Sequence, residues 1–322
     1  MNNRQIYFNE KKHRYTDEFG NFYTSVTTLI GNYENKFSDK ADDIALACER
    51  IGKNPFHAKY ERYKNMTAME IKRSWNKTSD VALDRGNKRH NFLEDSVKTS
   101  SGFVRLRPKL TGDRLYTVDN ILKDTSIGLV NLRDFERTGV RERYPRIYKI
   151  ISALVQDGWR LYAEIGVYNV DLLVSGLIDL FAVKGNQFII VDWKTNKMPI
   201  QFIGGYYEKD NKGNVSNFKV TNETMKVPLN YLQQCDGSKF GLQLGTYSFM
   251  AEFFGLEFSG AIICQILHDT YTKEDDVPNK WIGLERVETY EIPYMKDDVE
   301  KMLNHYVYSR NNGQLSMGGV YT

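Results

Sequence analysis

Apolar residues are densest between residues 159 and 194, where they follow the pattern of β-strands. β-Branched and aromatic side chains dominate this stretch, and the run from Phe188 to Val191 is continuously apolar, as in a strand buried on both faces. Gly185 and Asn186 separate two of the runs in the manner of a tight hairpin turn. We therefore predict three strands, at 159–168, 171–183 and 187–194, with the last two forming a hairpin.

Helical patterns stand on both sides of these strands. From Ser79 to about Lys98, apolar residues and Gly86 recur mostly every three or four positions, which builds one helix face. The order of helix, three strands, helix and strand is that of an α/β fold with a mixed central sheet flanked by helices, and not that of an alternating βα barrel. Further helices are predicted at 141–157, 240–254 and 296–308, and further strands at 259–267 and 281–293.

The remaining segments are assigned to an N-terminal part, two insertions and a tail. The first thirty residues are predicted as a β-hairpin followed by the start of a helix, and 38–75 as charged helix broken near Gly52 to Pro55. Residues 99–140 and 204–239 are polar and irregular, so we expect them to be insertions. The expected organisation is a hairpin and helical segment at 1–78, a core at 79–308 and a C-terminal tail at 309–322.

Composition narrows the class of protein. The 322 residues are 41% hydrophobic and 26% charged, which excludes a disordered or fibrous chain and suits one large domain or two smaller ones. No run of about 18 apolar residues occurs, and the first residues lead into no apolar signal segment. Three distant cysteines are too few for a disulfide framework or a four-cysteine iron–sulfur cluster. We therefore expect a cytoplasmic protein with no membrane association and no iron–sulfur cluster.

The net charge does not decide whether the protein binds nucleic acid. Lys plus Arg is 44 and Asp plus Glu is 41, which gives a formal net charge of +3. A nuclease can combine acidic metal ligands with a basic surround, so this value neither requires nor excludes a nucleic-acid partner. Aromatic residues reach 13% with 21 tyrosines, and such rings can build a core or stack on bases.

Two aspartates and a lysine stand near the ends of the predicted hairpin strands. Asp179 lies thirteen residues before Asp192, and Lys194 follows two positions later. Residues two apart on one strand point to the same side of the sheet, and the hairpin can bring Asp179 beside them. Carboxylate oxygens suit Mg²⁺ or Mn²⁺. The ammonium of Lys194 can orient an attacking water or stabilise charge on a phosphate.

The alternative interpretation of these residues is an ion pair at the surface end of a strand, which is common for an isolated aspartate-x-lysine pattern. Here the pattern ends the most apolar run of the chain. Charges in such a place need a partner or a metal ion, because burial of an unpaired charge is costly. The residues alone leave both interpretations open.

Four separated motifs resemble those of the PD-(D/E)xK nuclease superfamily. They are Arg85 to His90 followed by Glu94, Gly176 to Asp179, Asp192 to Thr195, and Gln243 to Tyr247. The first is similar to the GxxxH helix and the last to the QxxxY helix of the RecB-like exonuclease branch, which includes phage exonucleases and the mitochondrial genome maintenance exonuclease. Each motif is weakly specific alone, whereas their order and spacing over about residues 79–268 are specific together. Ile178 replaces the superfamily's proline, which is usual in this branch.

This resemblance implies a restriction-endonuclease-like PD-(D/E)xK core and a set of site residues. His90 would join Asp179 and Asp192 as a metal ligand, with Mg²⁺ as the cofactor and Mn²⁺ as a substitute. Glu164 would lie beside the metal site. Catalytic roles would fall to Asp179, Asp192, Lys194, Glu164, Gln243 and Tyr247. Each of three residues also has a purely structural interpretation: His90 as a packed histidine, Glu164 as a charge at a strand end, and Tyr247 as a core residue.

The same resemblance and the basic residues suggest how DNA would be held. Gln243 and Tyr247 would contact DNA near the site, and Arg85 belongs to the first motif. Thr195 could bond a phosphate, while Arg105 and Arg107 could line a DNA track. Ordinary solvated surface is the alternative for the arginines.

We expect a Mg²⁺-dependent deoxyribonuclease, in the first place an exonuclease acting on single-stranded DNA from a free end. Its setting would be replication, recombination or repair in a phage-like system, with possible partners among replication or recombination proteins. A structure-specific endonuclease or junction resolvase needs the same residues and stays an alternative. A non-catalytic DNA-binding protein would have lost an acid or the lysine, and a structural protein would bind no metal. The sequence leaves the oligomeric state open and favours a monomer only slightly, because the resembled family includes both monomers and rings.

Overall fold

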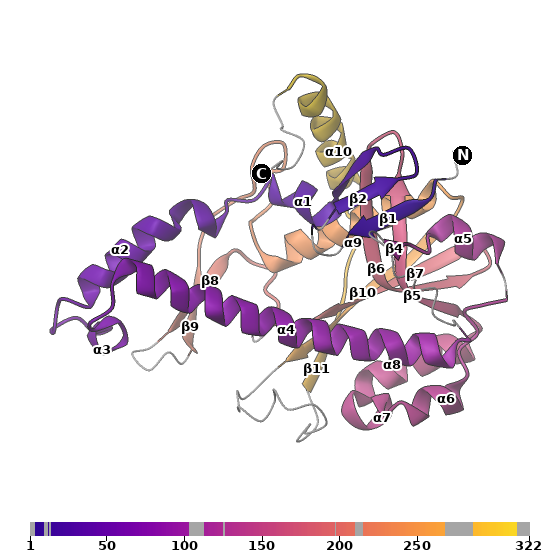
Figure 1. Cartoon of the computed structure of the whole chain (residues 1–322), viewed down its shortest axis with the longest axis horizontal. Coiled ribbons are helices and arrows are strands. Elements are labelled where there is room, and N and C mark those ends of the chain that lie inside the picture. The colour runs from indigo at the N-terminus through magenta and orange to yellow at the C-terminus, as the bar shows by residue number, and fades with distance from the viewer. Residues whose placement is uncertain are drawn as a thin grey trace. The chain divides into compact units, whose positions relative to one another are not determined.

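The computed structural model describes residues 4–9, 12, 14–102, 113–124, 126–196, 198–209, 215–267 and 286–313. The chain forms two compact units (Figure 1). Unit 1 consists of residues 1–30, 88–200 and 239–322, and unit 2 of residues 31–87 and 201–238. Both units therefore combine segments that are far apart in the sequence, and this grouping cuts across the expected boundary at residue 78.

Unit 1 is built on a mixed central sheet. Its nine strands within the described residues run in the order β11-β10-β7-β6-β3-β2-β1-β4, with β5 paired to β6. The pairs β7–β10 and β3–β6 are parallel, and the other pairs are antiparallel. The strands are β1 (Ile6–Asn9), β2 (Arg14–Asp17), β3 (Phe22–Ser25), β4 (Asp113–Arg114), β5 (Arg160–Asn169), β6 (Val174–Lys184), β7 (Gln187–Lys194), β10 (Glu257–Leu267) and β11 (Arg286–Glu291).

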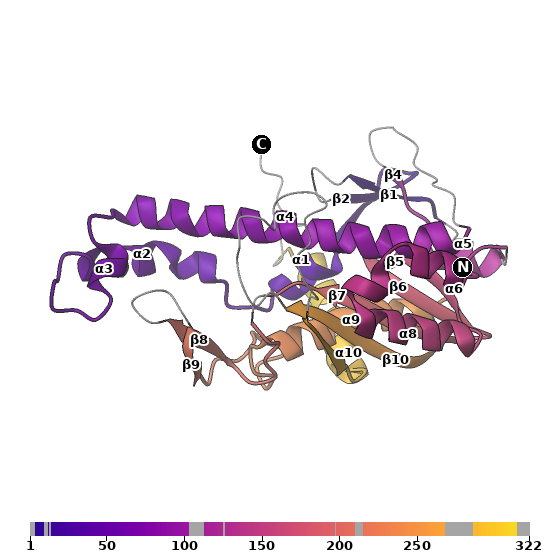
Figure 2. The ribbon, with the colours of Figure 1, turned by 90° about the horizontal axis from the view of Figure 1, so that it is seen from below.

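Helices flank this sheet. The C-terminal part of α4 (Ala68–Ser100) and α8 (Pro145–Gln156) lie side by side and pack on β5, β6 and β7 (Figures 1 and 2). Leu93 and Val97 of α4 and Ile147 and Ile151 of α8 are fully buried in the resulting core cluster, together with Trp193. The other helices are α1 (Val26–Gly31), α5 (Val118–Lys123), α6 (Leu132–Arg137), α7 (Val140–Arg143), α9 (Asp236–Glu252) and α10 (Lys296–Asn311). An α/β fold with a mixed central sheet flanked by helices is thus confirmed.

Unit 2 is smaller and has its own apolar cluster. Ala45 of α2 and Ile71 of α4 are fully buried there, with Cys48 close to them. The ring of Phe37 meets that of Trp75 edge-on, with centroids 5.6 Å apart. Its elements are η2 (Phe37–Lys40), α2 (Ala41–Ile51), α3 (Tyr60–Tyr63), residues 68–87 of α4, and the hairpin of β8 (Gly205–Lys209) and β9 (Val215–Val220).

Most predicted elements appear within a few residues of their expected ends, but the structure differs from the prediction in three places. The helix expected at 79–98 extends over 68–100, because Thr67 and Glu70 form a hydrogen-bonded start that lies outside the apolar pattern. The helix expected at 141–157 is divided into α7 and α8 at Tyr144, since Pro145 suits only the first turn of a helix.

The third difference concerns the segments expected to be irregular. The described part of 99–140 contains β4, α5 and α6, and 204–239 contains the β8–β9 hairpin. The strand expected at 281–293 is β11, although residues 281–285 lie outside the described part of the chain. Among the described helices, none is both long enough and apolar enough to cross a membrane.

Candidate active site

The β6–β7 hairpin places Asp179 and Asp192 side by side. The antiparallel register ends at Leu180 opposite Val191, and the next residues of the two strands are Asp179 and Asp192. Instead of another ladder bond, Asp179 Oδ2 accepts a hydrogen bond of 2.8 Å from the backbone N–H of Trp193. The strand pair therefore ends on two adjacent carboxylates, as the hairpin pattern predicted.

Helix α4 brings His90 to the first of these carboxylates. His90 Nδ1 lies 3.6 Å from Asp179 Oδ2, and the two side chains are 33% and 21% exposed. Burial alone would lower the pKa of His90, but the neighbouring negative charge of Asp179 outweighs it and raises this pKa. Burial likewise opposes ionisation of Asp179, yet the His90 charge and hydrogen bond hold the pKa of Asp179 below its usual value.

Lys194 lies at the second carboxylate. Its Nζ is 2.5 Å from Asp192 Oδ2, and the two side chains are only 17% and 4% exposed. The ammonium also lies 4.8 Å from the centre of the Phe240 ring, within the range of a cation–π contact. Asp192 and Lys194 thus share one side of the strand, as their spacing predicted.

The two aspartates differ in their affinity for protons. Burial is the main cause that raises the pKa of Asp192 to about 6, with the charge of Asp179 adding to it and Lys194 opposing it. The pKa of Asp179 is shifted in the opposite direction. Between the lowered pKa of Asp179 and a pH of about 6, the two adjacent carboxylates therefore hold one proton between them, and a cation would replace that proton.

These residues also provide the donors that a divalent cation needs. In the described residues no group of three or more His, Cys, Asp or Glu side chains has the closeness of a ready-made metal site. Asp192 Oδ2, however, is buried and receives no well-directed hydrogen bond from a described residue, although Lys194 Nζ is near. A buried carboxylate oxygen with spare capacity, an ionised carboxylate and an imidazole form a donor set that fits Mg²⁺ or Mn²⁺.

Glu164 belongs to a neighbouring charge cluster. The pairs Ala163–Leu180 and Ile165–Ile178 put Glu164 opposite Asp179 on the adjacent strand. Its φ of 57° is in the left-handed region, which is unusual for a residue with a side chain. Glu164 Oε2 accepts a 2.7 Å hydrogen bond from Lys98, a residue of α4.

Lys98 joins a second acid to this cluster. It also pairs with Glu94, one turn earlier on α4. Burial first, and then hydrogen bonding with Glu164, raise the pKa of Glu94 to about 8. Sequence reasoning missed Lys98, although its four-residue spacing from Glu94 on a helix was a usable signal.

Gln243 and Tyr247 meet on α9. Gln243 Nε2 donates to Tyr247 Oη over 3.1 Å, and the side chains are almost completely buried. The ring of Tyr247 lies against Gly176 of the β6 motif. These are the contacts of packed side chains, and direct contact of either residue with DNA stays a prediction.

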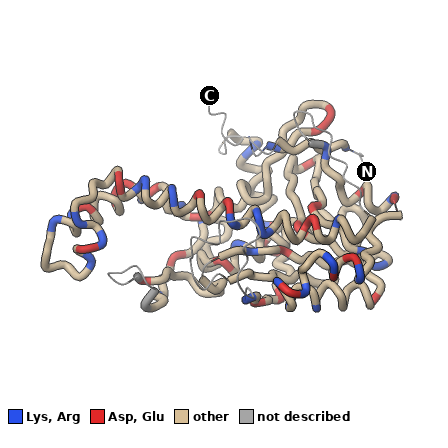
Figure 3. The backbone as a smooth tube through the Cα atoms, turned by 60° about the horizontal axis from the view of Figure 1, so that its bottom comes forward, with Lys and Arg blue, Asp and Glu red and all other residues tan. Residues whose placement is uncertain are grey.

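The structure describes only some of the other residues that are expected to bind DNA. Thr195 is half-buried directly after β7, and Arg85 is half-buried in the part of α4 that belongs to unit 2. Arg105 and Arg107 lie outside the described residues. Basic and acidic residues are interspersed along the described chain (Figure 3). DNA binding by these residues also stays a prediction.

Comparisons with known proteins add little to this site. No protein-family model matches the chain, and no curated protein matches it. Among solved structures, one titled "Crystal structure of SSO0001" is similar at 15% identity with a TM-score of 0.23. The match covers 51% of this chain and 58% of that one, so it spans little more than half of that protein. At this TM-score the likeness carries no argument about the site.

Proposed function

We propose that the protein is a metal-dependent deoxyribonuclease with a PD-(D/E)xK-type core. The observation that carries this proposal is the meeting of His90, Asp179, Asp192 and Lys194, which three elements bring together from residues 90 to 194. Their chemistry agrees with the motifs that resemble RecB-like exonucleases. A surface ion pair, the alternative interpretation, does not account for an Asp192 side chain that is only 4% exposed.

In this proposal His90, Asp179 and Asp192 would hold one or more Mg²⁺ ions. The bound ion would supply Lewis-acid activation of water and of the phosphate. Asp179 Oδ2 accepts a hydrogen bond from the backbone N–H of Trp193, and this bond orients the carboxylate. Lys194 is held between Asp192 and the face of Phe240, so its ammonium is positioned to hold a water or a phosphate oxygen.

The proposed substrate is single-stranded DNA, which the enzyme would degrade from a free end. The proposed setting is replication, recombination or repair. Its support is the resemblance to the RecB-like branch, together with the aromatic residues available for stacking. The hydrolytic residues would be the same in a structure-specific endonuclease or junction resolvase. A non-catalytic DNA-binding protein is less well supported, since both aspartates and the lysine are present.

The test uses purified full-length protein with Mg²⁺, Mn²⁺ or EDTA. Linear single-stranded and duplex DNA, labelled at either end, and a covalently closed circle are compared at one enzyme concentration. We expect short products from linear single strands, no products in EDTA, and an intact circle. Rapid nicking of the circle would favour the endonuclease, and DNA binding without any metal-dependent cleavage would refute the proposal.

The matched control is an exposed aspartate in unit 1. Asp134 on α6 has a side chain 47% exposed and forms an ion pair with Arg137, three residues later. Asp134→Asn should cleave like the wild type, while Asp192→Asn should not. Equal activity of both variants would refute the assignment of the site.

A further inference from the structure

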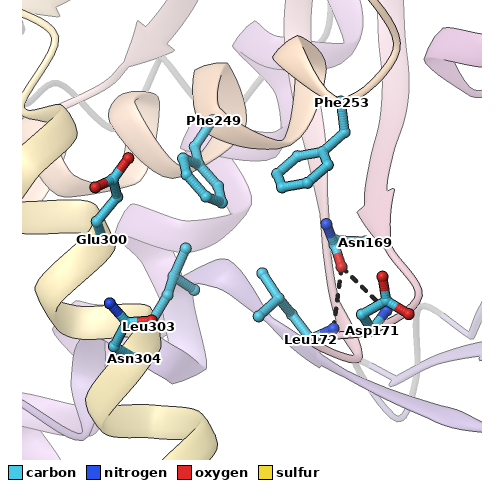
Figure 4. Close-up of a pocket in the computed structure, with 8 residues that line it drawn as sticks. All are labelled: Asn169, Asp171, Leu172, Phe249, Phe253, Glu300, Leu303 and Asn304. Atoms are coloured by element: carbon cyan, nitrogen blue, oxygen red, sulfur yellow. Dashed lines mark hydrogen bonds between the residues drawn. The ribbon is translucent and has the colours of Figure 1, made fainter.

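A pocket in unit 1 has no residue in common with the proposed nuclease site. It has a volume of about 290 Å³ and is formed by α9, α10 and the turn between β5 and β6 (Figure 4). Phe249 of α9 and Phe253, in the turn directly after α9, line one side, and Glu300 of α10 and Asp171 of the β5–β6 turn lie on different sides of the pocket (Figure 4). Leu303, which is 2% exposed, belongs to the apolar wall.

The wall formed by the β5–β6 turn is fixed by hydrogen bonds. Asn169 Oδ1 accepts hydrogen bonds from the backbone N–H groups of Asp171 and Leu172, each 3.0 Å long. Arg310 of α10 donates to the backbone carbonyl of Leu172 over 2.7 Å, which ties the turn to that helix. These hydrogen bonds order the turn that forms one wall of the pocket.

Aromatic rings and negative charge coincide in this pocket. The rings of Phe249 and Phe253 meet edge to face with centroids 5.1 Å apart, and Phe253 is 51% exposed. Lys296, one turn before Glu300, forms an ion pair with Glu252 at 2.8 Å, and Glu300 itself is exposed. Ring faces and carboxylates both attract cations, and neither would favour an anion.

We propose that this pocket binds an arginine side chain presented by a partner protein. A planar guanidinium can stack on a phenylalanine ring and donate to a carboxylate at the same time, which a compact ammonium does less well. Drug-sized ligands need about 300–1,000 Å³, so a space at the bottom of that range suits one side chain better than a larger ligand. The proposal stands on the pocket alone and is independent of the nuclease assignment.

The probe for this site is N-acetyl-arginine amide, titrated into full-length ¹⁵N-labelled protein and followed by amide NMR shifts. We expect saturable shifts at Leu172, Phe253 and Asn304, the last of which also lines the pocket. N-Acetyl-citrulline amide has the same shape without the charge and should give at least about fivefold weaker binding. Shifts of equal size from both probes would overturn the proposal.

Variants distinguish binding of the probe in the pocket from nonspecific attraction of the probe to acidic residues elsewhere. Glu300→Gln and Phe253→Ala should each weaken binding of the arginine probe by about threefold or more. Glu257→Gln, an exposed acid on β10 outside the pocket, should leave it unchanged. Loss of binding in Glu257→Gln alone, equal binding in all three variants, or no saturable shift at all would overturn the proposal. Thermal melting confirms that each variant is folded.

Discussion

The ring of Tyr247 occupies the space that a side chain on Gly176 would need. A Cβ added to Gly176 would lie 2.3 Å from Cε1 of this ring, which is far inside contact distance. Two motifs separated by more than sixty residues, at Gly176 and Tyr247, thus meet through one close contact. The glycine is required here by the neighbouring ring, since its own φ is not in the left-handed region.

Gly176→Ala should therefore lower the melting temperature by about 2–8 °C, as overpacking of a buried site usually costs about 1–3 kcal/mol. The measurement is thermal unfolding of the full chain. The matched control is Gly260→Ala on β10, where the nearest atom to an added Cβ is 4.0 Å away and little change is expected. In a Tyr247→Leu background the cost of Gly176→Ala should shrink, and an unchanged cost would contradict the contact.

The two aspartates should be individually essential for metal-dependent cleavage. Asp179→Asn and Asp192→Asn remove a charge from the site but keep the shape of the side chain. Cleavage with Mg²⁺ should fall below detection in both variants, and calorimetry should show weaker Mn²⁺ binding. Turnover close to that of the wild type in either variant would exclude that residue from the site.

Lys194 should act on turnover rather than on metal affinity. Lys194→Ala removes a positioned ammonium, a change that typically costs about 100-fold or more in rate. An ammonium is not a metal ligand, so Mn²⁺ binding measured by calorimetry should stay close to that of the wild type. Metal binding lost together with retained turnover would reverse the roles assigned to Lys194 and Asp192.

His90 can be tested by the choice of metal. His90→Ala should weaken activity with Mg²⁺, and Mn²⁺ should restore part of it, because Mn²⁺ compensates better for a missing ligand. The structural alternative is a packed histidine that merely pairs with Asp179 at 3.6 Å. A lower melting temperature with an unchanged response to both metals would support that alternative.

The sequence predicted the hairpin that carries the aspartates because its signals are local. A continuous apolar run and the Gly185-Asn186 turn determine β6, β7 and their register. This register ends at Leu180 and Val191, directly beside Asp179 and Asp192. The short helices between residues 99 and 140 lack such a signal. They depend on side-chain caps such as Asn131, which accepts from the amides of Arg133 and Asp134, and on packing against the rest of unit 1.

Contacts between distant segments could not be predicted from pattern alone. The approach of His90 to Asp179 depends on how α4 packs on the sheet, and only the resemblance to a family suggested it. The pair of Lys98 and Glu164, which are 66 residues apart, had no sequence signal beyond the helix spacing of Lys98 and Glu94. The left-handed φ of Glu164 was equally absent from the sequence pattern, because glutamate has no intrinsic preference for that backbone region.

The cluster of Glu94, Lys98 and Glu164 should make stability depend on pH. Two carboxylates share one ammonium, and burial raises the pKa of Glu94 from 4.5 to about 8. The folded protein therefore holds a proton that the unfolded chain releases between these two values. The corresponding stabilisation is complete below pH 4.5 and is lost as the pH rises through about 8.

Glu94→Gln should remove this pH dependence, because glutamine keeps a hydrogen-bonding side chain without a proton to lose. Between pH 6 and 9, in EDTA, the melting temperature of the wild type should fall by about 2–6 °C more than that of the variant, which corresponds to about 1–2 kcal/mol. Glu257→Gln, an exposed acid outside the cluster, should follow the wild-type curve. Parallel curves for the wild type and Glu94→Gln would show that Glu94 is ionised throughout this range, and that Lys98 alone satisfies both carboxylates.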